Sequence, residues 1–214
     1  EYMERDLKIN ETFQDSAGQC RALDNLGVAF FTMGRYKDAI QRHSAQCSLA
    51  YEMKEPLDII NALTHLGNAF EKTGDHVQAL KTYKESLRFA KDQGSDDLIF
   101  QAYVNLGNAY ISSGEVEKAM TIHHHHLTFA KETKDKEEEA EAYALLGHAC
   151  FIKSNFEQSI MFFQQLLSVA VQTSDMKLKA RAYAGMGQAN RSMGNLFHAQ
   201  SCHEQQLKLC KDTG

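Results

Sequence analysis

The chain has 214 residues, 43% of them hydrophobic, and carries a formal net charge of −5 at pH 7. Acidic and basic residues alternate along it, which argues against nucleic-acid binding, because that role usually shows a basic stripe. No stretch approaches the roughly 18 apolar residues of a membrane span, so we expect no membrane partner. The five cysteines form no Cys-x-x-Cys pair, which favours free thiols in a reducing compartment and hence a cytoplasmic protein.

A small pair of residues recurs every forty positions along almost the whole chain. The pairs are Leu26-Gly27, Leu66-Gly67, Leu106-Gly107, Leu146-Gly147 and Met186-Gly187. A fixed period of this length indicates stacked copies of one structural unit rather than a globule with a single core. The pattern therefore predicts function on an extended surface.

The repeats can be placed in chain order from this period. Residues 1–13 match the second half of a preceding repeat's second helix, because Leu7 and Ile9 align with Leu87 and Phe89. Five repeats follow at 16–54, 55–94, 95–134, 135–174 and 175–214. Neither edge carries an atypical polar capping helix, which solenoids usually need for solubility. We therefore expect an excerpt from a longer array.

Each repeat is predicted to contain two helices. The first opens after an acidic residue or Ser, and Asp and Ser side chains accept hydrogen bonds from the free N–H groups of a helix start: Asp15, Glu55, Ser95, Asp135 and Asp175. Pro56 stands at a first helical position, where its missing N–H costs least. The first helix is expected to stop at Gly34, Gly74, Gly114 and Gly194, with Ser154 in the fourth repeat.

The second helix is predicted to begin near Tyr36, His76, Val116, Phe156 and Leu196. Gly27 and Ala39, with their equivalents, are expected where the two helices of a repeat cross closely. A glycine inside a helix costs roughly 0.5–1 kcal/mol relative to alanine. Its recurrence must therefore be offset by packing.

A run of four histidines, His123 to His126, falls inside a predicted second helix. His123 aligns with His43, Tyr83, Phe163 and His203, so it belongs to the repeat. Only His123 and His126 share a helix face, which favours a structural role over metal binding. A second interpretation is that these histidines form a pH-sensitive interface.

No constellation of residues indicates catalysis. The glycines are too far apart to cradle a phosphate, and no Ser-His-Asp order or supported carboxylate pair occurs. The charged run from Lys134 to Glu141 suits a solvated helix start. We expect no enzyme activity, no catalytic residue, no metal site and no cofactor.

When the five repeats are aligned, the residues at equivalent positions form columns. The pattern of these columns resembles the tetratricopeptide repeat, a helix–turn–helix unit usually 34 residues long. Asn105-Leu106-Gly107-Asn108-Ala109, in a forty-residue repeat, is similar to the Pins/LGN adaptors of cell polarity and cell division and to tetratricopeptide repeat protein 28. The resemblance implies an all-α, right-handed superhelical α-solenoid of antiparallel helix pairs. It also implies a scaffold that binds an extended or helical partner segment in a concave groove lined by the first helices.

In such arrays the groove residues lie around the Leu-Gly pair. The residues that this implies here are Asn25, Asn61, Asn68, Gln101, Asn105, Asn108, His148, Arg181, Gln188 and Arg191. Asn and Gln both donate and accept, so they can hold a peptide backbone. Arg181 and Arg191 could bind acidic residues of the partner.

Three alternatives stay open at this stage. The asparagines can instead be solvated or bonded within their own repeat. The chain can be a self-associating structural spacer that stacks through its end repeats, or a non-catalytic flank of a larger protein.

Overall fold

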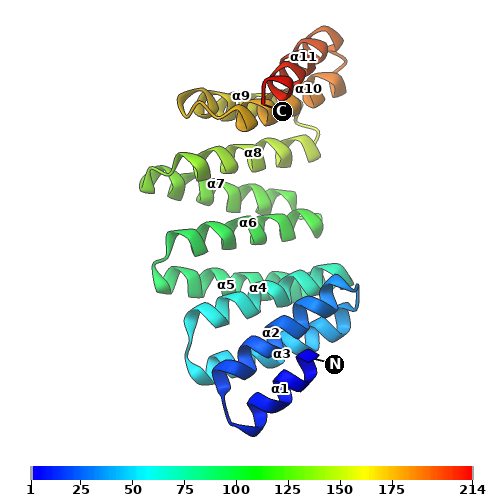
Figure 1. Cartoon of the computed structure of the whole chain (residues 1–214). Coiled ribbons are helices and arrows are strands. Elements are labelled where there is room, and N and C mark those ends of the chain that lie inside the picture. The colour runs from blue at the N-terminus through cyan, green and yellow to red at the C-terminus, as the bar shows by residue number, and fades with distance from the viewer. Residues whose placement is uncertain (1, 214) are drawn as a thin grey trace. The chain divides into compact units, whose positions relative to one another are not determined.

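The computed structural model describes residues 2–213, with side chains as far as residue 211. Over that range the structure contains eleven α-helices and no strand (Figure 1). It divides into two compact units, residues 1–113 and 114–214, which are described separately. The all-α solenoid class predicted from the sequence is confirmed. No described helix is both long and apolar enough to cross a lipid bilayer.

The first unit holds six helices. They are α1 (Tyr2–Thr12), α2 (Ser16–Thr32), α3 (Tyr36–Met53), α4 (Pro56–Thr73), α5 (His76–Gln93) and α6 (Asp96–Ser112). Each packs against the next one along the chain. The short connections between them make neighbouring helices antiparallel.

The helices of this unit form two layers. The backbones of the first helices of successive repeats approach one another, α2 against α4 and α4 against α6. The second helices α3 and α5 meet instead through the long side chain of Tyr51, whose hydroxyl donates to Glu85 and whose ring packs against Phe89. Beside this contact a cleft of about 270 Å³ lies between α3 and α5, with Leu63, Leu66 and Phe70 of α4 along it. Because α2, α4 and α6 lie closer together, they form the inner layer toward which this unit curves.

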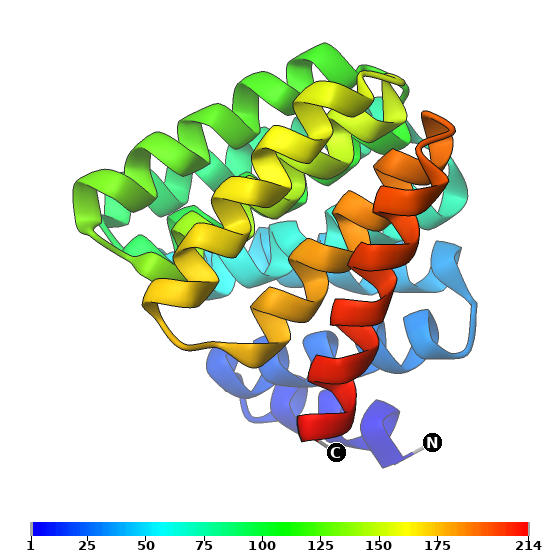
Figure 2. The ribbon, with the colours of Figure 1, turned by 90° about the horizontal axis from the view of Figure 1, so that it is seen from above.

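The second unit repeats the same plan. It contains α7 (Val116–Thr133), α8 (Lys136–Ile152), α9 (Phe156–Gln172), α10 (Met176–Ser192) and α11 (Leu196–Thr213). Each helix again packs against the next, and the first helices α8 and α10 touch each other. Figure 2 shows α9, α10 and α11 side by side.

The helix starts and stops agree with the predicted signals in all but one respect. The side chains of Asp15, Asp135 and Asp175 each accept from a backbone N–H of the first turn, and Pro56 opens α4. Ser95 stands at the predicted start of α6, but its hydroxyl makes no capping bond. The four predicted glycines have positive φ, and Ser154 adopts the same conformation with φ 61°.

The predicted close crossing of the two helices is present, and a ring side chain fills it. A Cβ on Gly67 would lie 2.6 Å from the ring of Tyr83, and one on Gly187 would lie 2.6 Å from His203. The small residues of the second helix complete the contact. Ser159, fully buried, donates to the carbonyl of Gly147 at 2.8 Å. The glycines therefore make room for a ring as well as for the opposing backbone.

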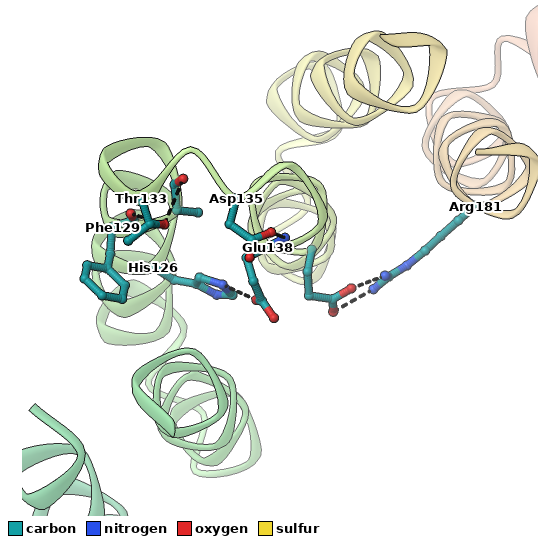
Figure 3. A network of polar contacts seen from close by, with 8 residues as sticks. His126, Phe129, Thr133, Asp135, Glu138 and Arg181 are labelled. Atoms are coloured by element: carbon teal, nitrogen blue, oxygen red, sulfur yellow. Dashed lines mark hydrogen bonds and ion pairs between the residues drawn. The ribbon is translucent and has the colours of Figure 1, made fainter. Parts of the chain in front are cut away.

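The histidine run lies as its helical spacing predicts. His123 and His126 are both fully buried, while His124 and His125 are exposed. The Nε2 atom of His126 lies 2.8 Å from a carboxylate oxygen of Glu138 on α8 (Figure 3). Neither ring nitrogen of His123 has a hydrogen-bond partner within the described part of the chain.

The ring contact leads to a first prediction, for Gly67→Ala. Tyr83 is 1% exposed and its hydroxyl is hydrogen-bonded, so the ring cannot retreat from an added methyl group. Overpacking costs about 1–3 kcal/mol, and alanine recovers about 1 kcal/mol of helix propensity. We expect a net loss of about 1 kcal/mol in the free energy of unfolding, measured by urea denaturation.

Gly147→Ala is the matched control for this experiment. Its Cβ would lie 3.0 Å from Phe163, a looser contact with a ring that has no polar anchor. The loss should therefore be smaller at this position. Equal stability of Gly67→Ala and the parent chain would refute the packing argument.

His123 leads to a second prediction, on pH dependence. Burial lowers its pKa to about 4 and His126 adds to this effect, whereas the Glu141 carboxylate acts in the opposite direction. The unfolded chain therefore binds more protons than the folded chain between about pH 4 and 6.5, so stability rises with pH across that window. Replacing His123 by Phe, the residue at the equivalent position 163, removes the contribution of His123, while His126, whose pKa burial also lowers to about 4, keeps its own.

The measurement compares urea unfolding at about pH 7.5 and about pH 5. The loss of unfolding free energy on acidification should be about 2 kcal/mol smaller in His123→Phe than in the parent chain. The exposed neighbour provides the control, because His125→Gln should keep the parental dependence. An unchanged dependence in His123→Phe would contradict the assignment.

Candidate functional site

A small cavity opens on the inner layer of the first unit. Its volume is about 190 Å³, and it is lined by Val28 and Phe31 of α2, His43 of α3, and His65 and Asn68 of α4. Four of these five residues stand in the columns around the Leu-Gly pair from which the groove was predicted. The fifth, His43, is 1% exposed and is the most buried of them. The cavity thus lies between the first helices of two consecutive repeats.

A polar network surrounds His43. The Nδ1 atom of His65 lies 2.8 Å from Oδ1 of Asp24, and Nδ1 of His43 lies 3.7 Å from the same oxygen. The Nδ1 atom of His43 is also 3.0 Å from Oε1 of Gln46. Hydrogen bonding to His65 lowers the pKa of Asp24, and burial lowers the pKa of His43. At neutral pH the cluster therefore combines a carboxylate with a neutral buried imidazole.

Asn68 is the predicted groove residue that lines the cavity. It is half-buried, and its Oδ1 accepts a hydrogen bond of 2.5 Å from the hydroxyl of Tyr83. That hydroxyl also lies 3.0 Å from a carboxylate oxygen of Glu71, and burial together with Glu71 raises the pKa of Tyr83. The oxygen of Asn68 is thus used within its own repeat, while its amide nitrogen can donate to a ligand.

The other predicted residues of this unit lie on inner-layer helices but outside the cavity. Asn25 of α2 is exposed and Asn61 of α4 is half-buried. On α6, Asn105 is half-buried, whereas Gln101 and Asn108 are exposed. They extend the polar surface of the inner layer, and the structure does not gather them at one point.

The predicted residues of the second unit lie on α8 and α10. His148, Arg181, Gln188 and Arg191 are all exposed. Arg181 forms a bidentate ion pair with Glu141, the residue at the equivalent position one repeat earlier, and one of its two bonds measures 3.1 Å (Figure 3). A partner carboxylate would have to displace Glu141 from Arg181. Arg191 makes no ion pair with any residue that the structure describes.

The sequence interpretation missed the Asp24 network. His43 was assigned to the aligned ring position of the repeat, but Asp24 was not connected with it, and the contact of Asp24 with His65 joins residues of different repeats. The signal was present in the alignment of repeats. The residues equivalent to Asp24 are Thr64, Val104, Ala144 and Ala184.

Comparison with known proteins gives the family and the fold. The family model described as tetratricopeptide repeat matches residues 58–132 and 98–171, together more than half of the chain. No curated protein matches the chain significantly. The Pins/LGN-like and forty-residue subclass therefore stays a prediction.

Several solved structures share the fold at low sequence identity. BtubC (BKLC) from P. vanneervenii is 13% identical with a TM-score of 0.79, covering 99% of this chain and 89% of its own. A putative kinesin light chain from Podosopora anserina, with nearly identical TPR-like repeats, is 14% identical with a TM-score of 0.74, covering 90% of this chain and 95% of its own. A Rap protein complexed with Competence and Sporulation Factor is 12% identical with a TM-score of 0.61, covering 91% and 64%. With the family model matching most of its central repeats, the chain belongs to the tetratricopeptide repeat family.

Proposed function

We propose that the chain is a protein–protein interaction scaffold whose inner-layer helices bind an extended or helical segment of a partner. Proteins built from tetratricopeptide repeats are generally scaffolds without catalytic activity, and this coarser description holds for the family as a whole. The observation that carries the finer proposal is the cavity between α2 and α4, lined by Val28, Phe31, His65 and Asn68. A cytoplasmic location is part of the same proposal.

The size and lining of the cavity define what it can accept. Its volume of about 190 Å³ is below the roughly 300–1,000 Å³ of pockets for drug-sized ligands. It suits one apolar side chain of a peptide, such as Leu or Met, packed against Val28 and Phe31. The amide nitrogen of Asn68 stands beside it and can donate to the peptide backbone.

Further contacts along the inner surface would come from the predicted amides. Asn105 and Asn108 of α6 are accessible to a backbone that passes over the inner layer. An acidic residue of the partner would bind at Arg191 rather than at Arg181, because Glu141 already pairs with Arg181. Among the similar folds, the Rap protein was solved in a complex with Competence and Sporulation Factor, which is consistent with binding of a second molecule.

A peptide-display screen with the whole chain tests the cavity. We expect the enriched peptides to share an apolar residue at one position, and binding to fall at least about tenfold in Val28→Lys, because a charge would be desolvated at the cavity wall. Val28 is 40% exposed, so the chain should fold with this substitution. Binding is measured by fluorescence anisotropy with a labelled peptide from the screen.

Val77→Lys is the control, because this exposed valine at the start of α5 does not line the cavity. It should keep parental binding. A triple variant, Asn68→Ala with Asn105→Ala and Asn108→Ala, measures the contribution of the amides. Equal binding by Val28→Lys and the parent chain would exclude the cavity as the peptide site.

Self-association is the second candidate function, and exposed apolar residues at both ends favour it. Ile9 and Phe13 near the end of α1 are 54% and 79% exposed, and Phe197 and Leu207 of α11 are 80% and 56% exposed. Buried between chains, such residues would stabilise stacking of end helices.

Sedimentation velocity over a range of concentrations tests this second candidate. Self-association predicts a mass that grows with concentration and returns to that of a monomer in Leu207→Glu. A control substitution at Met161, which is 63% exposed on α9, should leave the mass distribution of the parent chain unchanged. A monodisperse monomer at all concentrations would eliminate this candidate.

A further inference from the structure

Three helices of the first unit bring metal-ligating side chains together. Asp24 of α2, His43 of α3 and His65 of α4 each offer one ligand atom, and these atoms lie within 4.8 Å of one another. The two shortest separations given by hydrogen-bond and ion-pair geometry, from Oδ1 of Asp24, are 2.8 Å to His65 and 3.7 Å to His43. Ligands of a tetrahedral zinc ion, at about 2.0–2.1 Å from the metal, stand about 3.3 Å apart. Small side-chain adjustments would therefore suffice to bind an ion.

The donor set fits a transition metal better than a hard cation. Two imidazoles and one carboxylate are typical ligands of Zn²⁺ and related divalent ions, whereas Mg²⁺ and Ca²⁺ prefer oxygen alone. No Lys or Arg among the described residues forms an ion pair with Asp24, whose carboxylate faces the imidazoles of the two histidines. The carboxylate is therefore available to neutralise part of the charge of a cation.

The surroundings of the three ligands offer an outer-shell residue and an open coordination position. Gln46 is 3% exposed and lies within hydrogen-bonding distance of both His43 and Asp24. It could release Nδ1 of His43 to a metal and keep its bond to the carboxylate, which is the position of an outer-shell residue. His43 and His65 both line the cavity, so a fourth coordination position would open into it.

The repeat architecture does not require this cluster. The positions equivalent to Asp24 and His65, forty residues further along the chain, hold Thr64 and Asn105. His203 and Gln206 reproduce the His43–Gln46 pair at 3.3 Å, but Ala184 replaces the carboxylate. The same helix pair thus forms in other repeats without an acidic residue, so the full set of ligands is particular to the first unit.

We propose that Asp24, His43 and His65 form a binding site for one divalent transition-metal ion of the Zn²⁺ type, with a water molecule as the fourth ligand on the cavity side. The proposal does not depend on peptide binding. The exposed histidines of the run could also bind metal weakly, so His124→Ala and His125→Ala are introduced into every protein that is compared, the reference included.

The experiment titrates the whole chain with Co²⁺ and follows the visible absorption of the tetrahedral ion, then displaces it with Zn²⁺. We expect one equivalent to bind. Asp24→Thr and His65→Asn carry the residues of the next repeat, Thr64 and Asn105, so the fold should tolerate both. Each should weaken the affinity by at least about tenfold, since even loss of an outer-shell partner costs 10–100-fold.

His203→Tyr is the matched control, because it changes the residue equivalent to His43 in a repeat where Ala184 stands in place of Asp24. Its metal affinity should equal that of the reference. A second readout, the ¹⁵N resonances of the imidazoles, does not depend on any variant being folded: Zn²⁺ should shift those of His43 and His65. Absence of stoichiometric binding, equal binding by His65→Asn, or shifts confined to other histidines would overturn the proposal.

Discussion

The Cβ atoms that Gly67, Gly147 and Gly187 lack would lie between 2.6 and 3.0 Å from a ring of the facing helix. This contact between a helical glycine and a ring lets the two helices of a repeat approach at their crossing point. A side chain at the glycine would separate them or push the ring out. The rest of each unit then follows: paired helices stack, the backbones of the first helices approach one another, and the second helices meet through long side chains such as Tyr51 and His124.

The ring itself differs from repeat to repeat, and that difference determines how polar the surroundings of each Leu-Gly pair are. Phe163 is enclosed between Gly147 and Gly185, so the contact there is purely apolar. Tyr83 fills the same place, but its hydroxyl reaches Asn68 and Glu71. His43 has two ring nitrogens and is surrounded by polar groups. One structural position therefore changes from a packing element to a polar site while the helix pair is preserved.

The sequence predicts the fold well because its determinants are local. Helix starts at Asp15 and Asp135 and the stops at glycine depend on residues a few positions apart. The forty-residue period then places the same helix pair five times along the chain. The site is predicted less completely. Asp24 meets His65 across 41 positions, and Arg181 meets Glu141 across 40, so neither contact can be recognised within one repeat. Once consecutive repeats are aligned, the unusual aspartate at position 24 is the visible sign of the first contact.

The two proposals concern overlapping side chains, which has a thermodynamic consequence. His43 and His65 line the cavity proposed for a partner side chain and also belong to the proposed metal site. An ion at this position would stand at the base of the cavity, and a ligand entering it would meet the open coordination position. Any change that the ion makes in the affinity for the ligand must then equal the change that the ligand makes in the affinity for the ion. A carboxylate or imidazole of the partner could replace the water and give positive coupling, whereas an apolar side chain would leave the ion without its fourth ligand and give negative coupling. The sign of this coupling therefore reports the chemical nature of the partner group that enters the cavity.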